Sequence, residues 1–295
     1  MGAVKLVRKL FHRLVKPVEV LDVLKKYVEL RPTGTEVVTL ADALGRVLAE
    51  GVYASWDAPP FDRSEVDGYA TVARSLEGAE EDNPVALRVT GHVKIGETPT
   101  LEIRVGEAAE IDTGAMIPRG ADSVVMVEYT KQKGNEVLVY RSVAPGENIA
   151  RAGSDILRGE LILREGTLLT SAEIAALAAV GVDKVKVFKS PRVGIISIGD
   201  ELVEPGAELK GSQIFDVNTY SLAAAVKELG GTPKIYGIVK DEESSIRNAL
   251  LKALSESDIV LTSGGTSAGV GDLTYRVLDS LGSPGVVIHG LKQKP

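Results

Sequence analysis

Acidic residues occur at three points in the last third of the chain, each time after a short apolar run. Asp200 and Glu201 follow RVGIISI, Asp241 follows KIYGIV, and Asp272 ends the segment SGGTSAGVGD after DIVLTS. Carboxylates gathered in one place repel one another unless a cation or hydrogen-bond donors offset their charge. Carboxylate oxygens bind Mg²⁺ well, often together with substrate phosphates. The pattern therefore predicts a divalent cation, most simply Mg²⁺, acting on a phosphorylated substrate.

The elements around these residues predict that they share one edge of a sheet. RVGIISI, KIYGIV, DIVLTS and GVVIH are predicted strands, with helices between them in residues 213–231, 244–257 and 273–282. Apolar strands that alternate with helices indicate a parallel sheet with right-handed crossovers, here a doubly wound α/β domain. Ligands of such sheets bind beyond the carboxyl ends of the strands. The acidic residues at the three strand ends are thus expected to form one site.

The same residues also have structural explanations. Asp241 and Asp272 each precede a predicted helix, where Asp commonly caps the free N–H groups. The glycine segment offers a similar choice. Its amides at Gly264, Gly265 and Gly269 could bind an anion beside the start of a helix, or the segment could be only a turn. It contains neither GK[ST] nor GxGxxG, so it is not a P-loop or a dinucleotide-binding loop.

Composition excludes several classes of protein. The 295 residues carry a net charge of −7 and only 4% aromatic side chains, which argues against nucleic acid as a partner. Cysteine is absent, so disulfides, thiolate nucleophiles and cysteine-bound metals are excluded. No apolar run is long enough to span a bilayer, and residues 1–17 are predicted to form an amphipathic helix that docks on protein rather than on a membrane. A cytoplasmic location is expected.

The first two thirds of the chain change character twice. Residues 17–50 show helical spacing, and residues 84–143 form alternating segments typical of a small antiparallel sheet or barrel: ALRVTGHVKI, LEIRV, SVVMVEYT and EVLVYRSV. A helix is predicted over SAEIAALAAVG, from Thr170 or Ser171 to Gly181. Two polar segments, 59–70 and 110–125, have neither periodicity. They concentrate four polar side chains that form a second candidate site: Asp62, Ser64, Asp67 and Thr113. For residues 59–70, an Asx-type turn that leads into a strand is the alternative.

Several motifs, taken in order, resemble one family. They are PPFDRSEVDGYA, DTGAMIPRGADSVVMVE, GDELVEPG, GSQIFDVNTYSL, TSGGTSAGVGD and the closing HGLKQKP. Together they resemble the MoeA family of molybdopterin molybdenumtransferases, which are related to the gephyrin E domain. The match extends over the whole chain. It departs from the family at Val66, where Met is common.

The resemblance implies a multidomain fold. An elongated split domain for dimerisation is expected in residues 1–55 and 145–190, with a small inserted β domain in residues 56–144. Residues 191–295 are expected to form a MogA-like doubly wound α/β domain. Family members continue past this point, so their C-terminal β domain is expected to be absent.

The resemblance also implies a reaction, the insertion of molybdate into adenylylated molybdopterin with release of AMP and with Mg²⁺ as the metal ion. The chain has few Asn, Gln and Cys beside many Glu and Lys, a composition typical of proteins from thermophiles. For a protein of such an organism, tungstate is an alternative to molybdate as the oxyanion. The family's catalytic positions correspond to Asp67, Thr113, Asp155, Glu201, Asp241, Asp272 and Lys294. Glu201, Asp241 and Asp272 are expected at the metal, and Ser263, Gly264, Gly265, Thr266, Ser267 and Gly269 at the pterin phosphate and nucleotide. For Asp155, a purely structural role in closing a turn remains an alternative.

The implied partners are a second copy of the chain, forming a cytoplasmic homodimer with a shared cleft, and a MogA-like adenylyltransferase that hands over the substrate. Two other functions compete with this interpretation. One is a non-catalytic scaffold fragment of the gephyrin type. The other is a different Mg²⁺-dependent hydrolase of nucleotide anhydrides built on the same acidic edge.

Overall fold

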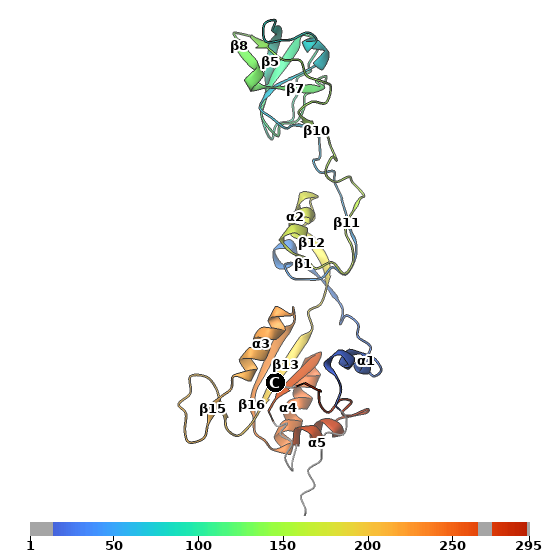
Figure 1. Ribbon diagram of the computed structural model, residues 1–295, viewed down its shortest axis with the longest axis vertical. Helices are drawn as coiled ribbons and strands as arrows, with labels where there is room; N and C mark the ends of the chain where they lie inside the picture. Colours follow the sequence, from blue (N-terminus) through green and yellow to red (C-terminus); the bar gives the residue numbers. More distant parts are fainter. Residues whose placement is uncertain (1–13, 265–272, 294–295) are drawn as a thin grey trace, which may run out of the picture. The chain divides into compact units, whose positions relative to one another are not determined.

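The computed structural model describes residues 14–264 and 273–293. The chain divides into two compact units, Val38–Val185 and a second unit made of Met1–Val37 with Lys186–Pro295. It passes from one unit to the other through strands β1 (Thr35–Thr39) and β12 (Lys184–Phe188), which pair with each other (Figure 1). The predicted N-terminal helix falls mainly on residues 1–13, outside the described residues.

The second unit contains a parallel sheet of three strands in the order β16-β13-β17 (Figure 1). The strands are β13 (Arg192–Ile198), β16 (Thr232–Val239) and β17 (Ile259–Ser263). Helices α3 (Asn218–Glu228), α4 (Glu243–Glu256) and α5 (Leu273–Ser280) follow them in turn. The predicted parallel sheet and its three helices are therefore confirmed.

Helices cover both faces of this sheet. Val193 and Ile195 of β13 pack with Val226 of α3, while Ile196 and Ile198 pack with α4, as successive side chains of a strand point to opposite faces. Because both faces are buried, RVGIISI is almost continuously apolar.

The predicted fourth strand, GVVIH, is wrong within the described residues. The N–H of Val286 donates instead to Asp279 Oδ1 at 3.2 Å, and Gly285 has φ of +74°. These residues fold back on the end of α5. The N–H of Val286 bonds to the nearby side chain of Asp279 and not to a neighbouring strand, which GVVIH would need in order to join the sheet.

The helical prediction for residues 17–50 is largely wrong. Only η1 (Pro17–Glu19), α1 (Val20–Leu24) and a single turn, η2 (Leu40–Asp42), are helical. Between them lies β1, whose sequence TEVVT is rich in β-branched residues that favour strands. Its partner β12 lies far away in the sequence, so local periodicity could not reveal the pairing.

The other unit is dominated by a six-stranded sheet in the order β7-β4-β6-β5-β9-β8 (Figure 1). Its strands are β4 (Gly68–Thr71), β5 (Val85–Val93), β6 (Glu107–Ile111), β7 (Ser123–Met126), β8 (Thr130–Lys133) and β9 (Glu136–Val139). Two short 3₁₀ turns, η3 (Ala73–Leu76) and η4 (Val127–Tyr129), follow β4 and β7. The small sheet predicted from the alternating segments is present, but β5 and β6 run parallel, so the sheet is mixed rather than purely antiparallel.

One predicted strand of this sheet, LEIRV, does not form. The N–H of Ile103 bonds to the carbonyl of Arg119 in a loop, and β6 starts after Gly106, which has φ of +86°. The strand forms over EAAEI instead, because Ala108 buries its side chain in one hydrophobic cluster of this unit and Ala109 and Ile111 bury theirs in another.

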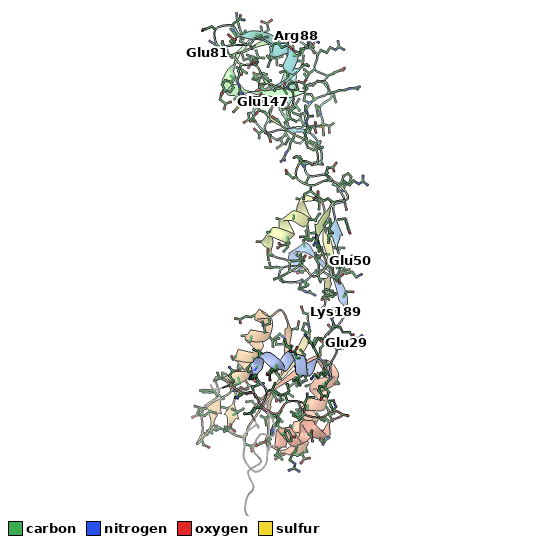
Figure 2. All side chains as sticks on the ribbon, turned by 45° about the vertical axis from the view of Figure 1, so that its right-hand side comes forward. Glu29, Glu50, Glu81, Arg88, Glu147 and Lys189 are labelled. Atoms are coloured by element: carbon green, nitrogen blue, oxygen red, sulfur yellow. The ribbon has the colours of Figure 1, made fainter. Side chains whose placement is uncertain are left out.

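The remaining elements of this unit are short. Strand β2 (Val52–Tyr53) pairs with β11 (Leu161–Leu163), and β3 (Arg63–Ser64) pairs with β10 (Ile149–Ala150). Helix α2 (Ser171–Ala179) is as predicted, with Thr170 and Glu173 forming a capping box. Arg88 and Glu147 lie in the unit that holds the six-stranded sheet (Figure 2). They form ion pairs with Glu107 and Arg141 in which the arginine is exposed and the carboxylate partly buried.

Two further short strands, β14 (Leu202–Val203) and β15 (Ile214–Phe215), form a parallel pair in the α/β unit. Within the described residues, none of the helices has both the length and the apolar character that a membrane-crossing helix needs.

Candidate functional site

The carboxyl edge of the parallel sheet brings two of the predicted acidic residues together. Ile198 and Val239 lie opposite each other at the ends of β13 and β16, so the chain segments that follow them are neighbours. Asp200 Oδ1 accepts a hydrogen bond from the N–H of Asp241 at 3.3 Å. Asp241 does not cap the next helix: the residue before α4 is Glu242, and no side chain caps that helix. The carboxylate of Asp241 is therefore exposed at this edge without a capping role.

Glu201 lies beside the same edge. Its carboxylate is close to the backbone of Gly199, where a methyl group would lie 2.7 Å from Glu201 Oε2. Among the described residues, no three acidic or histidine side chains are close enough to hold a metal ion between them. Asp272, the third predicted metal ligand, lies outside the described residues, as does Lys294.

The glycine segment leaves the sheet at Ser263 and Gly264. Gly264 has φ of +86°, and a methyl group on it would lie 2.0 Å from the carbonyl oxygen of Ile198. A glycine is thus required here, because the chain turns in a left-handed conformation directly against the end of β13. The other predicted ligand-binding positions, Gly265, Thr266, Ser267 and Gly269, lie outside the described residues.

A buried polar cluster at the start of α3 was missed from the sequence. Ser197 Oγ donates to Asp216 Oδ1 at 3.0 Å and lies 2.8 Å from Thr219 Oγ1, and the N–H of Thr219 also donates to Asp216 Oδ1 at 3.1 Å. Next to the cluster, Asn218 Nδ2 donates to Ser263 Oγ at 2.7 Å. The available signal was GSQIFDVNTYSL, in which Asp, Asn and Thr stand directly before an amphipathic helix.

Asp216 is only 2% exposed. Burial raises the pKa of its carboxyl group, but hydrogen bonds from Thr219, Ser197 and Asn218 outweigh burial and hold the pKa below its usual range. The carboxylate is therefore ionised at neutral pH. Its second oxygen, Oδ2, is buried and has no hydrogen-bond partner among the described residues.

In the sheet unit, Asp67 and Thr113 form a second polar cluster. Asp67 precedes β4 and Thr113 follows β6, and these strands pair antiparallel with Gly68 opposite Ile111. The N–H and the hydroxyl of Thr113 both donate to Asp67 Oδ1, at 2.7 and 2.8 Å. The two hydrogen bonds, that of the N–H first, lower the pKa of Asp67.

Two residues beside this pair were not singled out from the sequence. His92 Nε2 lies 2.7 Å from Asp112 Oδ1, and the N–H of Ile95 donates to Asp112 Oδ2 at 3.3 Å. The hydrogen bond to His92 is the main reason that the pKa of Asp112 is lowered, although the nearby charge of Asp67 acts against it. His92 lies on β5, opposite Glu110 of β6. Only this pairing, which the sequence does not show, links it to the segment with Thr113.

Asp155 lies in a bend that follows the turn at residues 152 and 153. Its N–H donates to the carbonyl of Ala58 at 3.0 Å, and its carboxylate accepts the hydroxyl of Ser154 at 3.4 Å. The structure describes no contact between Asp155 and the pair of Asp67 and Thr113. Asp62 accepts from the N–H of Ala152 and from Arg151, at 2.8 and 2.7 Å, and so ties this turn to the segment 59–70.

Thr113→Ala is expected to raise the pKa of Asp67 toward its ordinary value of 3.8 without reaching it, because the hydroxyl is lost but the N–H of residue 113 remains. In the wild type, the lowered pKa of Asp67 contributes to the stability of the fold at every pH above the ordinary pKa of the carboxyl group. This contribution is lost as the pH falls through the lowered pKa. An NMR titration of the Asp67 carboxyl carbon measures the shift. Thr113→Ser, which keeps the hydroxyl, should leave the pKa unchanged; an equal rise in both variants would contradict the assignment.

Comparison with known families connects both clusters to one family. Residues 15–181 match the family model described as "MoeA N-terminal region (domain I and II)". The chain belongs to the MoeA family. Residues 194–295 match a second model, "Probable molybdopterin binding domain". The pair of Asp67 and Thr113 thus lies in the MoeA N-terminal match, and the acidic edge with the start of α3 lies in the molybdopterin-binding match.

Individual relatives support this membership. The chain is 40% identical over 261 residues to a molybdopterin molybdenumtransferase from Nostoc sp., covering 88% of this chain and 60% of that protein. It is 35% identical over 284 residues to the molybdopterin molybdenumtransferase of Bacillus subtilis, covering 95% and 66%. A crystal structure of a molybdopterin biosynthesis MoeA protein from Pyrococcus horikoshii OT3 matches with a TM-score of 0.77 and 42% identity, covering 85% of this chain and 67% of that one. The MoeA-family chain therefore spans about 60% of the length of its Nostoc relative.

Proposed function

We propose that this MoeA-family chain is a molybdopterin molybdenumtransferase, which inserts molybdate into adenylylated molybdopterin and releases AMP. One observation carries the proposal. The carboxyl edge of a parallel sheet, where ligands of such folds bind, holds Asp200, Glu201 and Asp241 beside the point where the glycine segment begins. Relatives at 35–40% identity over most of the chain carry this activity in their names.

The edge suits the cleavage of a phosphoanhydride. Mg²⁺ is commonly held by one or two carboxylates together with substrate phosphates. Asp241 and Glu201 supply such carboxylates from the described residues, and we assign Asp272 as a third ligand. When bound there, Mg²⁺ would neutralise charge on the phosphates of the substrate. Ser263 and the amide of Gly264 would then hold the phosphate side of the pterin nucleotide, with Gly265, Thr266, Ser267 and Gly269 continuing this contact.

The cluster in the sheet unit is proposed to act on the same substrate. The double hydrogen bond from Thr113 keeps Asp67 ionised, so that Asp67 is a fixed acceptor for a donor group of the pterin. We propose that Lys294 balances the negative charge of phosphate or molybdate. Asp155 has the weakest support of the proposed catalytic residues, because its described contacts are those of a turn.

The function is tested by incubating the chain with adenylylated molybdopterin and Mg²⁺, with and without molybdate. We expect AMP release together with molybdenum bound to the pterin, quantified by chromatography and by mass spectrometry of the metal. The full-length Nostoc relative serves as a positive control. Release of AMP that is independent of molybdate, with no metal transferred, would instead identify a nucleotide-anhydride hydrolase. Binding of the pterin nucleotide without turnover would indicate the scaffold alternative. The same assay with tungstate tests the second oxyanion.

We also propose that the chain functions as a homodimer through the ribbon of β2 and β11. Tyr53 and Leu161 lie directly opposite each other on this ribbon and are 59% and 38% exposed, and the nearby Trp56 is 64% exposed. A two-stranded ribbon is only marginally stable by itself, and exposed apolar side chains on it are best covered by another protein surface. A second copy of the chain is the occupant that we propose.

Tyr53→Glu combined with Leu161→Glu is expected to convert the dimer into a monomer at micromolar concentration, because two charges would be buried without partners in the interface. Light scattering measures the mass. The matched control is Val105→Glu, at an exposed apolar side chain in the same unit, which should remain dimeric. A monomeric wild type, or a dimer that survives the double substitution, would contradict this interface.

The proposed substrate must be made by another enzyme. Adenylylated molybdopterin must be made by transfer of an adenylyl group to molybdopterin, and we propose a MogA-like adenylyltransferase as the enzyme that hands it over. A cytoplasmic location is part of this proposal.

A further inference from the structure

The start of helix α3 lies over the ends of two neighbouring strands. Ser197 of β13 and Ser263 of β17 are opposite each other in the parallel register. Their side chains share the face that packs against α3, because Val193, Ile195 and Leu261 of the same strands pack with Val226 of that helix. The buried cluster of Ser197, Asp216 and Thr219 therefore stands next to the residue at which the glycine segment begins.

We propose that Asn218 is a positioning residue that makes the hydroxyl of Ser263 a hydrogen-bond donor to the substrate, and that Asp216 holds Asn218 in place. The inference rests on the proposed function, because it assigns an acceptor on the phosphorylated substrate to this hydroxyl. It goes beyond that function by giving a role to residues of GSQIFDVNTYSL.

The hydrogen-bond polarity supports this role. A serine hydroxyl has one proton to donate and two lone pairs that accept. Asn218 Nδ2 donates to Ser263 Oγ at 2.7 Å and so occupies one lone pair. The proton of Ser263 is thereby directed to another acceptor, as a phosphate oxygen would require. Replacing the amide of Asn218 by a carboxylate would reverse the bond, since the carboxylate would accept this proton.

The buried cluster fixes the backbone of Asn218. Asn218 is the first residue of α3, between Asp216 and Thr219. Asp216 Oδ1 accepts both the N–H of Thr219 and the hydroxyl of Ser197, so the start of the helix is attached to β13. Asp216 and Ser197 are 2% and 0% exposed, and water cannot readily replace these bonds. Asn218 itself is exposed, so substituting it should leave the core intact.

If Asp216 only capped helix α3, the substitutions would have different effects. Asp216 would still stabilise the start of α3, but the side chain of Asn218 would have no effect on substrate. The two possibilities are separated by a double-mutant cycle of Asn218→Ala and Ser263→Ala, with Asn218→Asp made in both backgrounds.

Substrate binding is measured first, by calorimetry with adenylylated molybdopterin. Each alanine variant is expected to weaken binding about tenfold, and the double variant also about tenfold rather than a hundredfold, because both remove the same hydrogen bond to a charged group. Asn218→Asp should weaken binding further, by about a hundredfold. Most of this extra loss should disappear in the Ser263→Ala background. If it persists there, charge repulsion alone explains it and the positioning role is overturned.

A second readout needs no ligand. Amide hydrogen exchange at Ser263 and Gly264 is followed by NMR on the full chain. Asn218→Ala should accelerate it about tenfold, while the amides of Ile195 and Ile196 in the middle of β13 stay protected. Unchanged exchange together with unchanged substrate binding would overturn the inference. If the wild type binds no pterin nucleotide, the proposed function fails, and exchange at Ser263 and Gly264 still decides whether Asn218 positions this segment.

Discussion

Gly264→Ala is expected to destabilise the α/β unit by about 3 kcal/mol, combining the left-handed backbone penalty with overlap in a packed region. The methyl group would lie 2.0 Å from the carbonyl oxygen of Ile198, and φ at Gly264 is +86°. The carbonyl oxygen belongs to the backbone of β13 and cannot swing aside as a flexible side chain could. The end of β17 must therefore move away from β13. Denaturant unfolding measures the loss of stability. AMP release should fall as well, because Ser263 moves with the displaced strand end.

Gly230→Ala is the matched control for this prediction. Gly230 has nearly the same conformation, with φ of +82°, but no atom lies within 4 Å of an added methyl group. The control should therefore cost only the backbone penalty, about 1 kcal/mol. Equal destabilisation by the two substitutions would show that the approach to Ile198 does not govern the position of the glycine segment.

Asp241→Asn is expected to lower kcat/KM for AMP release by about 100-fold, the range found when a group that stabilises transition-state charge is removed. The substitution keeps the size of the side chain. It also keeps the N–H of residue 241, which bonds to Asp200, so the stability of the fold should change little. Loss of the negative charge removes one proposed Mg²⁺ ligand. The concentration of Mg²⁺ needed for half-maximal rate should therefore rise.

Asp258→Asn makes the same chemical change at the opposite edge of the sheet. Asp258 accepts the N–H of Arg192 at 2.7 Å and lies 3.6 Å from its side chain, where β13 begins. This exposed pair contributes little to stability, and it lies at the amino end of the strands. Its loss should leave kcat/KM unchanged. A similar loss of kcat/KM in both variants would contradict a site at the carboxyl edge. The effect of Asp241→Asn would then come from the change in net charge or from a change in the fold.

Much of the α/β unit could be predicted because its signals are local. RVGIISI, KIYGIV and DIVLTS are strands of one parallel sheet, with helices between them. In the other unit, helix α2 begins at a capping box of Thr170 and Glu173, which are only three residues apart. The failures occurred where a distant partner or a local acceptor decided the outcome. TEVVT became a strand by pairing with β12, and GVVIH did not, because Asp279 took the N–H of Val286.

The site shows the same division. The strand-end pattern predicted that Asp200 and Asp241 would be neighbours, and the structure joins them by a hydrogen bond. His92 and Asp112 could not be paired from the sequence, because β5 and β6 run parallel across an intervening loop. The bond from Asn218 to Ser263 was equally hidden, since it joins the start of a helix to the end of a strand 45 residues away.

The sequence by itself determined the family, the three strands and three helices of the parallel sheet in the α/β unit, and which strand ends carry carboxylates. These depend on residue type and on spacing between near neighbours, which the chain states directly. Only the tertiary structure decided which polar groups are paired: Thr113 with Asp67, Asn218 with Ser263, and the buried Asp216 with Ser197. The reason is physical. A hydrogen bond needs its donor and acceptor about 3 Å apart, and packing of the sheets and helices sets that distance.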